Sequence, residues 1–109
     1  MALLKKAQVA SPVLPKETVE VAELGGDVVV RGLLFSERLA IYAGAGEDGR
    51  TFAQIPVLLA QTVIDADGVA IYSADEWEQF GARHMDALLR LFAVAKRLSG
   101  LDAEAAAKN

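Results

Sequence analysis

The sequence predicts an α+β domain in which an N-terminal antiparallel β-hairpin precedes a mainly helical C-terminal half. Apolar and polar residues alternate over residues 17–22, as they do in a half-buried strand. Residues 83–98 instead repeat their apolar positions at the period of an amphipathic helix. A chain of 109 residues has the length of one domain. We therefore assign residues 17–109 to a single domain and residues 1–16 to a flexible arm.

The hairpin is predicted from its two valine-rich strands and the glycines between them. Pro12 and Pro15 leave the preceding arm without a sustained period. After the first strand, Gly25-Gly26 offers a two-residue turn that tolerates positive φ. Residues 28–30, three consecutive valines, then return as the second strand.

Two short helices are expected in the middle of the chain. Ser36 is placed to cap a helix or turn over residues 37–42. Pro56 fits the first turn of the next helix, where its missing N–H is not needed. That segment has no charged residue, so we expect it to be covered on all sides. Its residues at helical spacing are Ile55, Leu58, Leu59, Thr62 and Val63.

A turn and a helix start follow. Asp67-Gly68 marks a tight turn, and residues 69–72 are expected to add a short strand. Ser73 and Glu76 have the spacing of a capping box, in which each side chain bonds to the backbone N–H of the other residue.

The last helical region begins at Trp77 and Phe80, and Gly81 is where we expect an interruption. Over residues 83–98 one broad face of the helix is apolar. Leu89 and Val94 flank this face and make it wider than packing against a single core requires. The residues of that face are Met85, Leu88, Leu91, Phe92, Ala95 and Leu98. The opposite face carries Arg83, Asp86, Arg90 and Arg97, with Asp86 and Arg90 as a favourable pair four residues apart. Gly100 is expected to end the helix and Asp102 to cap a final turn.

Composition excludes several classes of function. The net charge is −4 without a long basic run, which disfavours nucleic-acid binding. The absence of cysteine removes disulfides, thiol catalysis and thiolate metal sites.

The apolar share is 53%, above the usual range of about 45–50%. Alanine content alone is one explanation. The interpretation we prefer is apolar surface buried against further copies or a partner.

No segment of the sequence predicts export or membrane insertion. The first residues lack an apolar core of signal-peptide length. The longest uncharged stretch, residues 51–64, is too short to span a bilayer and contains Pro56. We expect a soluble, intracellular protein without a membrane partner.

Two motifs resemble ligand sites but lack parts of them. Residues 44–49 match GxGxxG, yet Glu47 and Asp48 would repel a pyrophosphate, so we interpret an acidic surface loop. Asp65, Asp67 and Glu76 occupy positions 1, 3 and 12 of a calcium loop, but Ala70 stands where the bend needs glycine. A hairpin turn explains Asp65 to Gly68 with fewer assumptions. We predict no cofactor and no metal.

No catalytic residue is predicted either. His84 is the single histidine, and a general base needs a nucleophile and a cleft that the sequence does not indicate. The serines at 36, 73 and 99 each have an expected structural role in capping or ending a helix. An enzyme would need a pocket that joins His84 to an acid.

The predicted functional surface is apolar and binds protein. Trp77 and Phe80 are either ordinary core or partly exposed oligomer contacts, because aromatic residues anchor interfaces. The arginine face is either solvated or meets an acidic neighbour. Candidate protein-binding residues are Leu58, Leu59, Trp77, Phe80, Leu89 and Val94. The widened stripe also predicts self-association with a contribution from the terminal helix.

Four segments carry a resemblance to a known family. In order they are Val28-Val29-Val30-Arg31-Gly32-Leu33, Glu37-Arg38, Ile64-Asp65-Ala66-Asp67-Gly68, and Leu98-Ser99-Gly100-Leu101 with the ending Lys108-Asn109. With this order and spacing, residues 17–109 resemble the tail assembly chaperones of long-tailed bacteriophages.

The resemblance implies a morphogenetic function in the host cytoplasm. Such chaperones bind the long, apolar, helical tape measure protein and keep it soluble. They help tail tube subunits assemble around it and leave before the virion is finished. The family tends to self-associate into rings or spirals, and often makes a longer frameshifted product. The alternatives are a structural virion component, such as a minor tail or head–tail connector protein, and a homo-oligomeric adaptor unrelated to phages.

Overall fold

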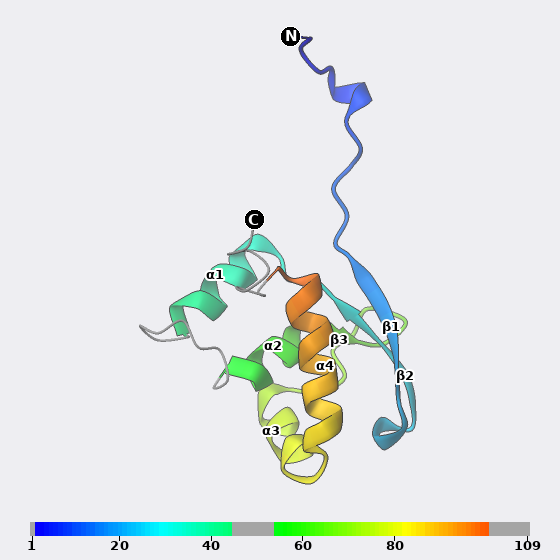
Figure 1. Ribbon diagram of the computed structural model, residues 1–109, viewed down its shortest axis with the longest axis vertical. Helices are drawn as coiled ribbons and strands as arrows, with labels where there is room; N and C mark the ends of the chain where they lie inside the picture. The colour runs from blue at the N-terminus through cyan, green and yellow to red at the C-terminus, as the bar shows by residue number, and fades with distance from the viewer. Residues whose placement is uncertain (1, 45–53, 101–109) are drawn as a thin grey trace.

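The computed structural model describes residues 2–44 and 54–100, in which an antiparallel sheet packs against helices and the N-terminal arm projects from the body (Figure 1). The sheet has the order β1-β2-β3, which confirms the α+β class. Its strands are β1 (Lys16–Val21), β2 (Gly26–Arg31) and β3 (Val63–Ile64). The helices are α1 (Phe35–Gly44), α2 (Ile55–Thr62), α3 (Ala74–Arg83) and α4 (Met85–Leu98), with 3₁₀ turns η1 (Lys6–Gln8) and η2 (Ala22–Leu24).

The hairpin is confirmed, but its turn differs from the prediction. β1 pairs with β2 from Lys16↔Arg31 to Val21↔Gly26, so Gly26 is a strand residue and the predicted two-residue turn is wrong. The connection has the 3₁₀ turn η2 followed by Gly25, whose φ of 91° is the left-handed conformation that glycine allows. Leu24 packs against the core from this turn, which explains why the longer connection forms.

The third strand lies at residues 63–64, where Val63 had been expected to continue the preceding helix, and not at the predicted residues 69–72. The Thr62 hydroxyl donates to the Leu58 carbonyl at 2.8 Å and competes with the helix backbone there. Val63 then pairs with Val30, and Ile64 with Val29. Within the described residues, the strand expected at residues 69–72 is only an isolated bridge between Ile64 and Ala70.

The start of α3 agrees with the sequence, whereas its end does not. The Ser73 Oγ accepts the Glu76 N–H at 3.2 Å, and the Ser73 N–H donates to Glu76 Oε1 at 2.9 Å, so the capping box is confirmed. The helix continues through Gly81 and ends at His84, which has φ −134° and ψ 58°. The interruption predicted at Gly81 is therefore wrong by three residues.

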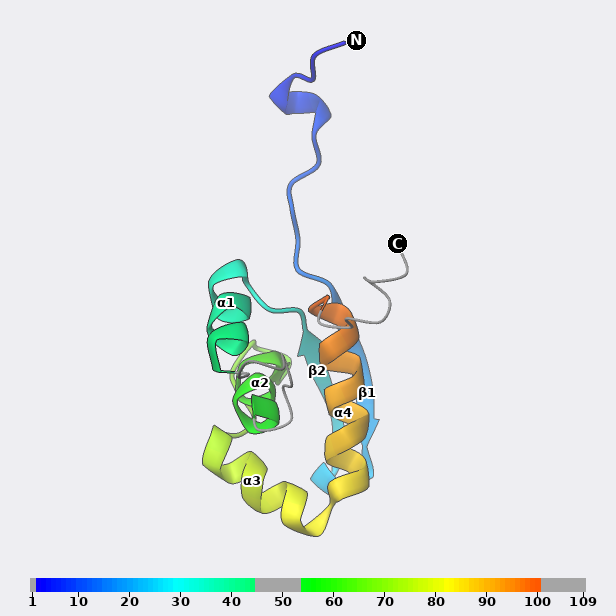
Figure 2. The same cartoon turned by 60° about the vertical axis from the view of Figure 1, so that its left-hand side comes forward.

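The core lies between the sheet and the helices. Helix α4 packs across the hairpin, and α2 and α3 complete the helical layer (Figure 2). Trp77, Leu59, Leu91, Val30 and Val63 are each 0% exposed and form its centre. Together they join β2, β3, α2, α3 and α4 into one apolar cluster.

Three of the segments that carry the family resemblance meet at one junction. Arg31 donates to both carboxylate oxygens of Glu37, at 2.9 and 3.0 Å. The Leu33 N–H donates to the buried Ser99 Oγ at 3.1 Å, and Arg38 donates to the Ser99 carbonyl. A Cβ on Gly32 would lie 2.7 Å from the Leu98 carbonyl oxygen, so glycine is required for this close approach. These residues hold the end of β2, the start of α1 and the end of α4 together.

The helix ends at this junction agree with the prediction only in part. Ser36 lies inside α1, so it is not the N-cap. Glu37 serves the helix start instead, because its Oε1 accepts the Leu34 N–H at 2.8 Å. Gly100 has a φ of 68° and ends α4 as predicted. The turn expected from Asp102 lies outside the described residues.

The junction should make the protein less stable in acid. The hydrogen bonds from Arg31 lower the pKa of Glu37, so its stabilising contribution is present above the ordinary glutamate pKa and is lost as pH falls through the lowered folded pKa. We expect Glu37→Gln to reduce the free energy of unfolding by about 1–2 kcal/mol at neutral pH. Urea unfolding of both proteins at neutral and acid pH measures this, and a difference that stays constant with pH would contradict it.

Candidate protein-binding surface

Four of the six predicted binding residues belong to the core. Leu58 is 1% exposed, Leu59 and Trp77 are 0% exposed, and Phe80 is 8% exposed. The Trp77 ring makes edge contacts with Tyr72 at 4.9 Å and with Phe80 at 5.3 Å between centroids. Their burial corrects the expectation that these side chains present a surface to a partner. Their helical spacing is compatible with either a core or an interface position, and in the structure all four side chains are buried in the core.

The remaining two candidates lie on α4. Leu89 is 37% exposed and is the member of the widened stripe that reaches the surface. Val94 is partly buried and packs against the core cluster. Of the six, Leu89 therefore offers the largest accessible apolar side chain.

The structure brings other apolar residues together in a groove between α2, α3 and α4. The groove has a volume of about 440 Å³. Met85 is 63% exposed at its side, and the fully buried Trp77 borders it from within the core. Its remaining lining residues are Ile55, Pro56, Glu78, Gly81 and Leu88. The groove is thus mainly apolar, with one carboxylate at its rim.

A second apolar surface lies on Leu34 and the α1 helix that follows it, which stands apart from the helical layer (Figure 1). Leu34, Phe35 and Leu39 are 50%, 75% and 51% exposed. Phe35 and Leu39 are one helical turn apart and share a face. This surface was not predicted, although the apolar run Leu33-Leu34-Phe35 precedes Glu37 in the sequence. Ile41, 1% exposed, anchors the helix to the core.

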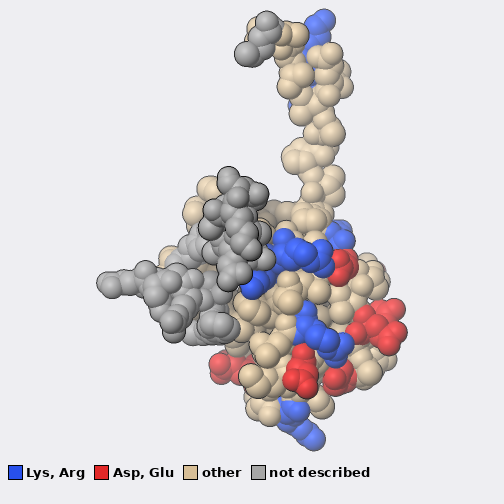
Figure 3. Space-filling model, viewed as in Figure 1, with Lys and Arg blue, Asp and Glu red and all other residues tan. Residues whose placement is uncertain are grey.

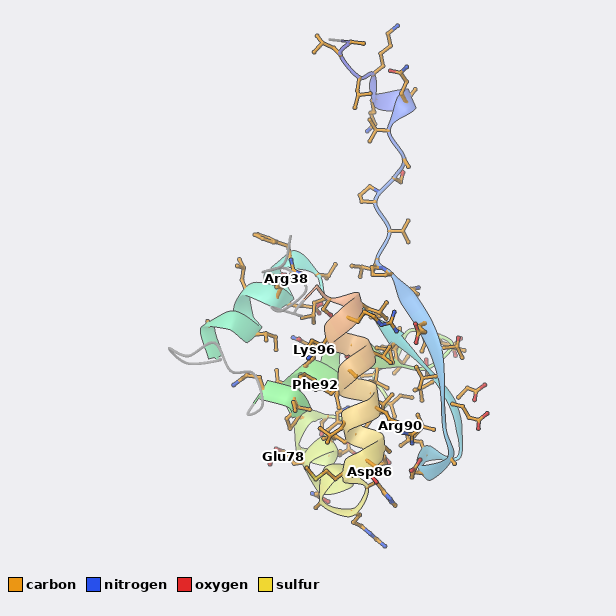
Figure 4. All side chains as sticks on the ribbon, viewed as in Figure 1. Arg38, Glu78, Asp86, Arg90, Phe92 and Lys96 are labelled. Carbon is orange, nitrogen blue, oxygen red and sulfur yellow. The ribbon has the colours of Figure 1, made fainter. Side chains whose placement is uncertain are left out.

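The charged face of α4 is partly engaged within the chain. Arg90 points toward the hairpin (Figure 4) and pairs with Glu23 at 3.1 Å, whereas Arg97 pairs with Glu17 at 2.8 Å. The predicted Asp86–Arg90 pair is therefore replaced by a pair with the hairpin. Basic and acidic side chains alternate over this part of the surface (Figure 3). Exposed pairs of this kind contribute little to stability, and both of them join α4 to the hairpin.

His84 lines a hollow of about 320 Å³ that also includes Glu23 and Glu76. This is the juxtaposition of a histidine with acids that an enzyme would need. Both carboxylates have other partners, since Arg90 binds Glu23 and the Ser73 N–H binds Glu76. The imidazole lies 5.1 Å from the Phe80 ring, and no described residue forms a side-chain hydrogen bond with it.

Of the two motifs that resemble ligand sites, the structure describes the one at Asp65 but only the first residue of the GxGxxG stretch. Asp65 Oδ1 accepts the N–H groups of Asp67 and Val69, at 2.8 and 2.9 Å, so this carboxylate closes the turn. Over residues 2–44 and 54–100, no cluster of three His, Asp or Glu side chains is arranged to hold a metal. The GxGxxG stretch lies outside the described residues, except for Gly44 at the end of α1.

We predict that neither motif binds its usual ligand. A ligand that prefers the folded state raises the unfolding midpoint. Thermal melts with calcium, with a nicotinamide dinucleotide and without either should therefore coincide. A reproducible increase with one of them would contradict the interpretation of the corresponding motif.

No protein-family model, curated protein or solved structure matches the chain. None of the helices among the described residues is long and apolar enough to cross a membrane.

Proposed function

We propose that the protein is a phage tail assembly chaperone that binds the tape measure protein and keeps it soluble during tail morphogenesis. The apolar groove between α2, α3 and α4 carries this proposal. A tape measure protein presents long apolar helical stripes, and such helices bind by placing their apolar side chains into a groove. The resemblance carried by residues 17–109 supplies the biological setting.

The size of the apolar surfaces also suits a chaperone. A groove of about 440 Å³ accepts part of one helical stripe, so a single contact would be weak and reversible. Further apolar area is available at Phe35 and Leu39 on α1. Several weak contacts along one long client raise the overall affinity through multivalency while each contact still dissociates. Release before completion of the virion requires this combination.

Co-expression tests the proposal. The tape measure protein should be largely insoluble when expressed alone and soluble when this chain is present. A client that is equally soluble without the chain would contradict the chaperone function. Purified virions should lack the chain, and its presence there in stoichiometric amount would favour the alternative of a structural tail or connector protein.

A further inference from the structure

The outer edge of β1 is open. The sheet ends at β1, and Figure 2 shows no strand beyond it on the side away from β2. Among the described residues, no backbone hydrogen bond reaches this edge from another segment. A free edge of this kind is a template for pairing with another strand.

The register identifies the residues whose backbone faces the open edge. The Gly32 N–H donates to the Pro15 carbonyl at 2.9 Å, so odd-numbered residues of β1 direct their N–H and C=O groups toward β2. Hydrogen-bonded and non-hydrogen-bonded pairs alternate along an antiparallel ladder. Lys16, Thr18 and Glu20 therefore direct their backbone groups outward, and their side chains are exposed.

Within the hairpin, the side chains of Lys16 and Glu20 lie opposite side chains of the same charge. Lys16 lies directly opposite Arg31, and Glu20 lies directly opposite Asp27. Like charges in such positions destabilise a sheet. Arg31 is balanced by Glu37 at 2.9 Å, but neither Lys16 nor Glu20 forms an ion pair with any described residue.

We propose that β1 pairs antiparallel with β1 of a second copy, about a two-fold axis at Thr18. This register places Lys16 opposite Glu20 of the second copy, and Glu20 opposite Lys16 of the second copy. Thr18 faces its own equivalent. All three positions are the ones that direct N–H and C=O outward, so charge pairing and backbone pairing select the same register. A shift by two residues would place Glu20 opposite Thr18 and remove both charge pairs.

The resulting assembly is closed. Two three-stranded sheets join into one continuous sheet, and each partner uses the same surface, as a two-fold contact requires. The inference does not depend on the proposed function, and it assigns self-association to the hairpin, whereas the sequence had predicted the terminal helix.

Reversing the charge at Lys16 or at Glu20 tests the proposed pairing of the two β1 strands. Lys16→Glu should weaken the dimer about tenfold or more, because two attractive pairs become repulsive. Glu20→Lys should do the same. Both changes place opposite charges across the hairpin, facing Arg31 or Asp27, so neither should lower the melting temperature of the monomer. Light scattering or sedimentation over a concentration series measures the dissociation constants.

Two combinations should restore the dimer. The double variant Lys16→Glu/Glu20→Lys again pairs opposite charges and keeps the net charge of the parent. An equimolar mixture of the two single variants should form a heterodimer, although neither pairs well with itself. Leu89→Glu, on the exposed face of α4, is the control and should dimerise like the parent. The proposal is overturned if the parent remains monomeric, if the single variants dimerise as tightly as the parent, or if Leu89→Glu is the change that weakens the dimer.

Discussion

Leu59→Glu is expected to unfold the domain. Leu59 is 0% exposed and lies on α2 within the apolar cluster. A carboxylate there would lose its hydration, and no described cation pairs with this part of the core. An unpaired buried charge costs several kcal/mol, which is comparable to the total stability of about 5–15 kcal/mol of a small domain. Far-UV circular dichroism and thermal melting should show loss of the cooperative transition.

Leu89→Glu is the matched control for this change. The same substitution at a side chain that is 37% exposed should lower the free energy of unfolding by about 1 kcal/mol or less. A Leu59→Glu protein that melts cooperatively at the midpoint of Leu89→Glu would contradict the burial of α2.

Met85→Glu is expected to remove the ability to keep the tape measure protein soluble. Met85 is 63% exposed, so the variant should fold. The new carboxylate would lie at the apolar groove that already contains Glu78 and would have to be desolvated when an apolar helix binds. We expect affinity for the client to fall at least about tenfold. Co-expression followed by separation of soluble and insoluble client measures the effect.

Val69→Glu is the control for the groove, because it makes an equally acidic change at a side chain that is 59% exposed and does not line the groove. It should protect the client as well as the parent protein does.

Phe35→Glu tests the apolar surface of α1 separately. If Phe35→Glu abolishes protection and Met85→Glu does not, the client binds α1 and the assignment of the groove is wrong.

The local features with a short-range cause could be predicted from the sequence. The capping box at Ser73, the position of Pro56 and the left-handed Gly100 each depend on neighbouring residues. The hairpin also followed from its alternation. The break at His84 could not be predicted, because Gly81 was the only local sign of an interruption and α3 continues through it.

The binding surface was harder to predict than the fold. A period of 3.6 shows which residues share a helix face, but it does not show what that face meets. Trp77 and Phe80 therefore appeared as interface candidates, although the tertiary structure buries both. Phe35 was overlooked for the opposite reason, since only the position of α1 outside the helical layer leaves its ring exposed.

We propose above all that the groove binds an apolar helix of the tape measure protein, and the emission of the buried Trp77 senses changes in the side chains around it. It is the single tryptophan of the chain and borders the groove from within the core. The decisive measurement is a titration of the purified protein with a tryptophan-free helical segment of the tape measure protein, followed by tryptophan emission. The proposal predicts a saturable change that Val69→Glu preserves and Met85→Glu removes. Absence of binding, or equal binding by both variants, would contradict it.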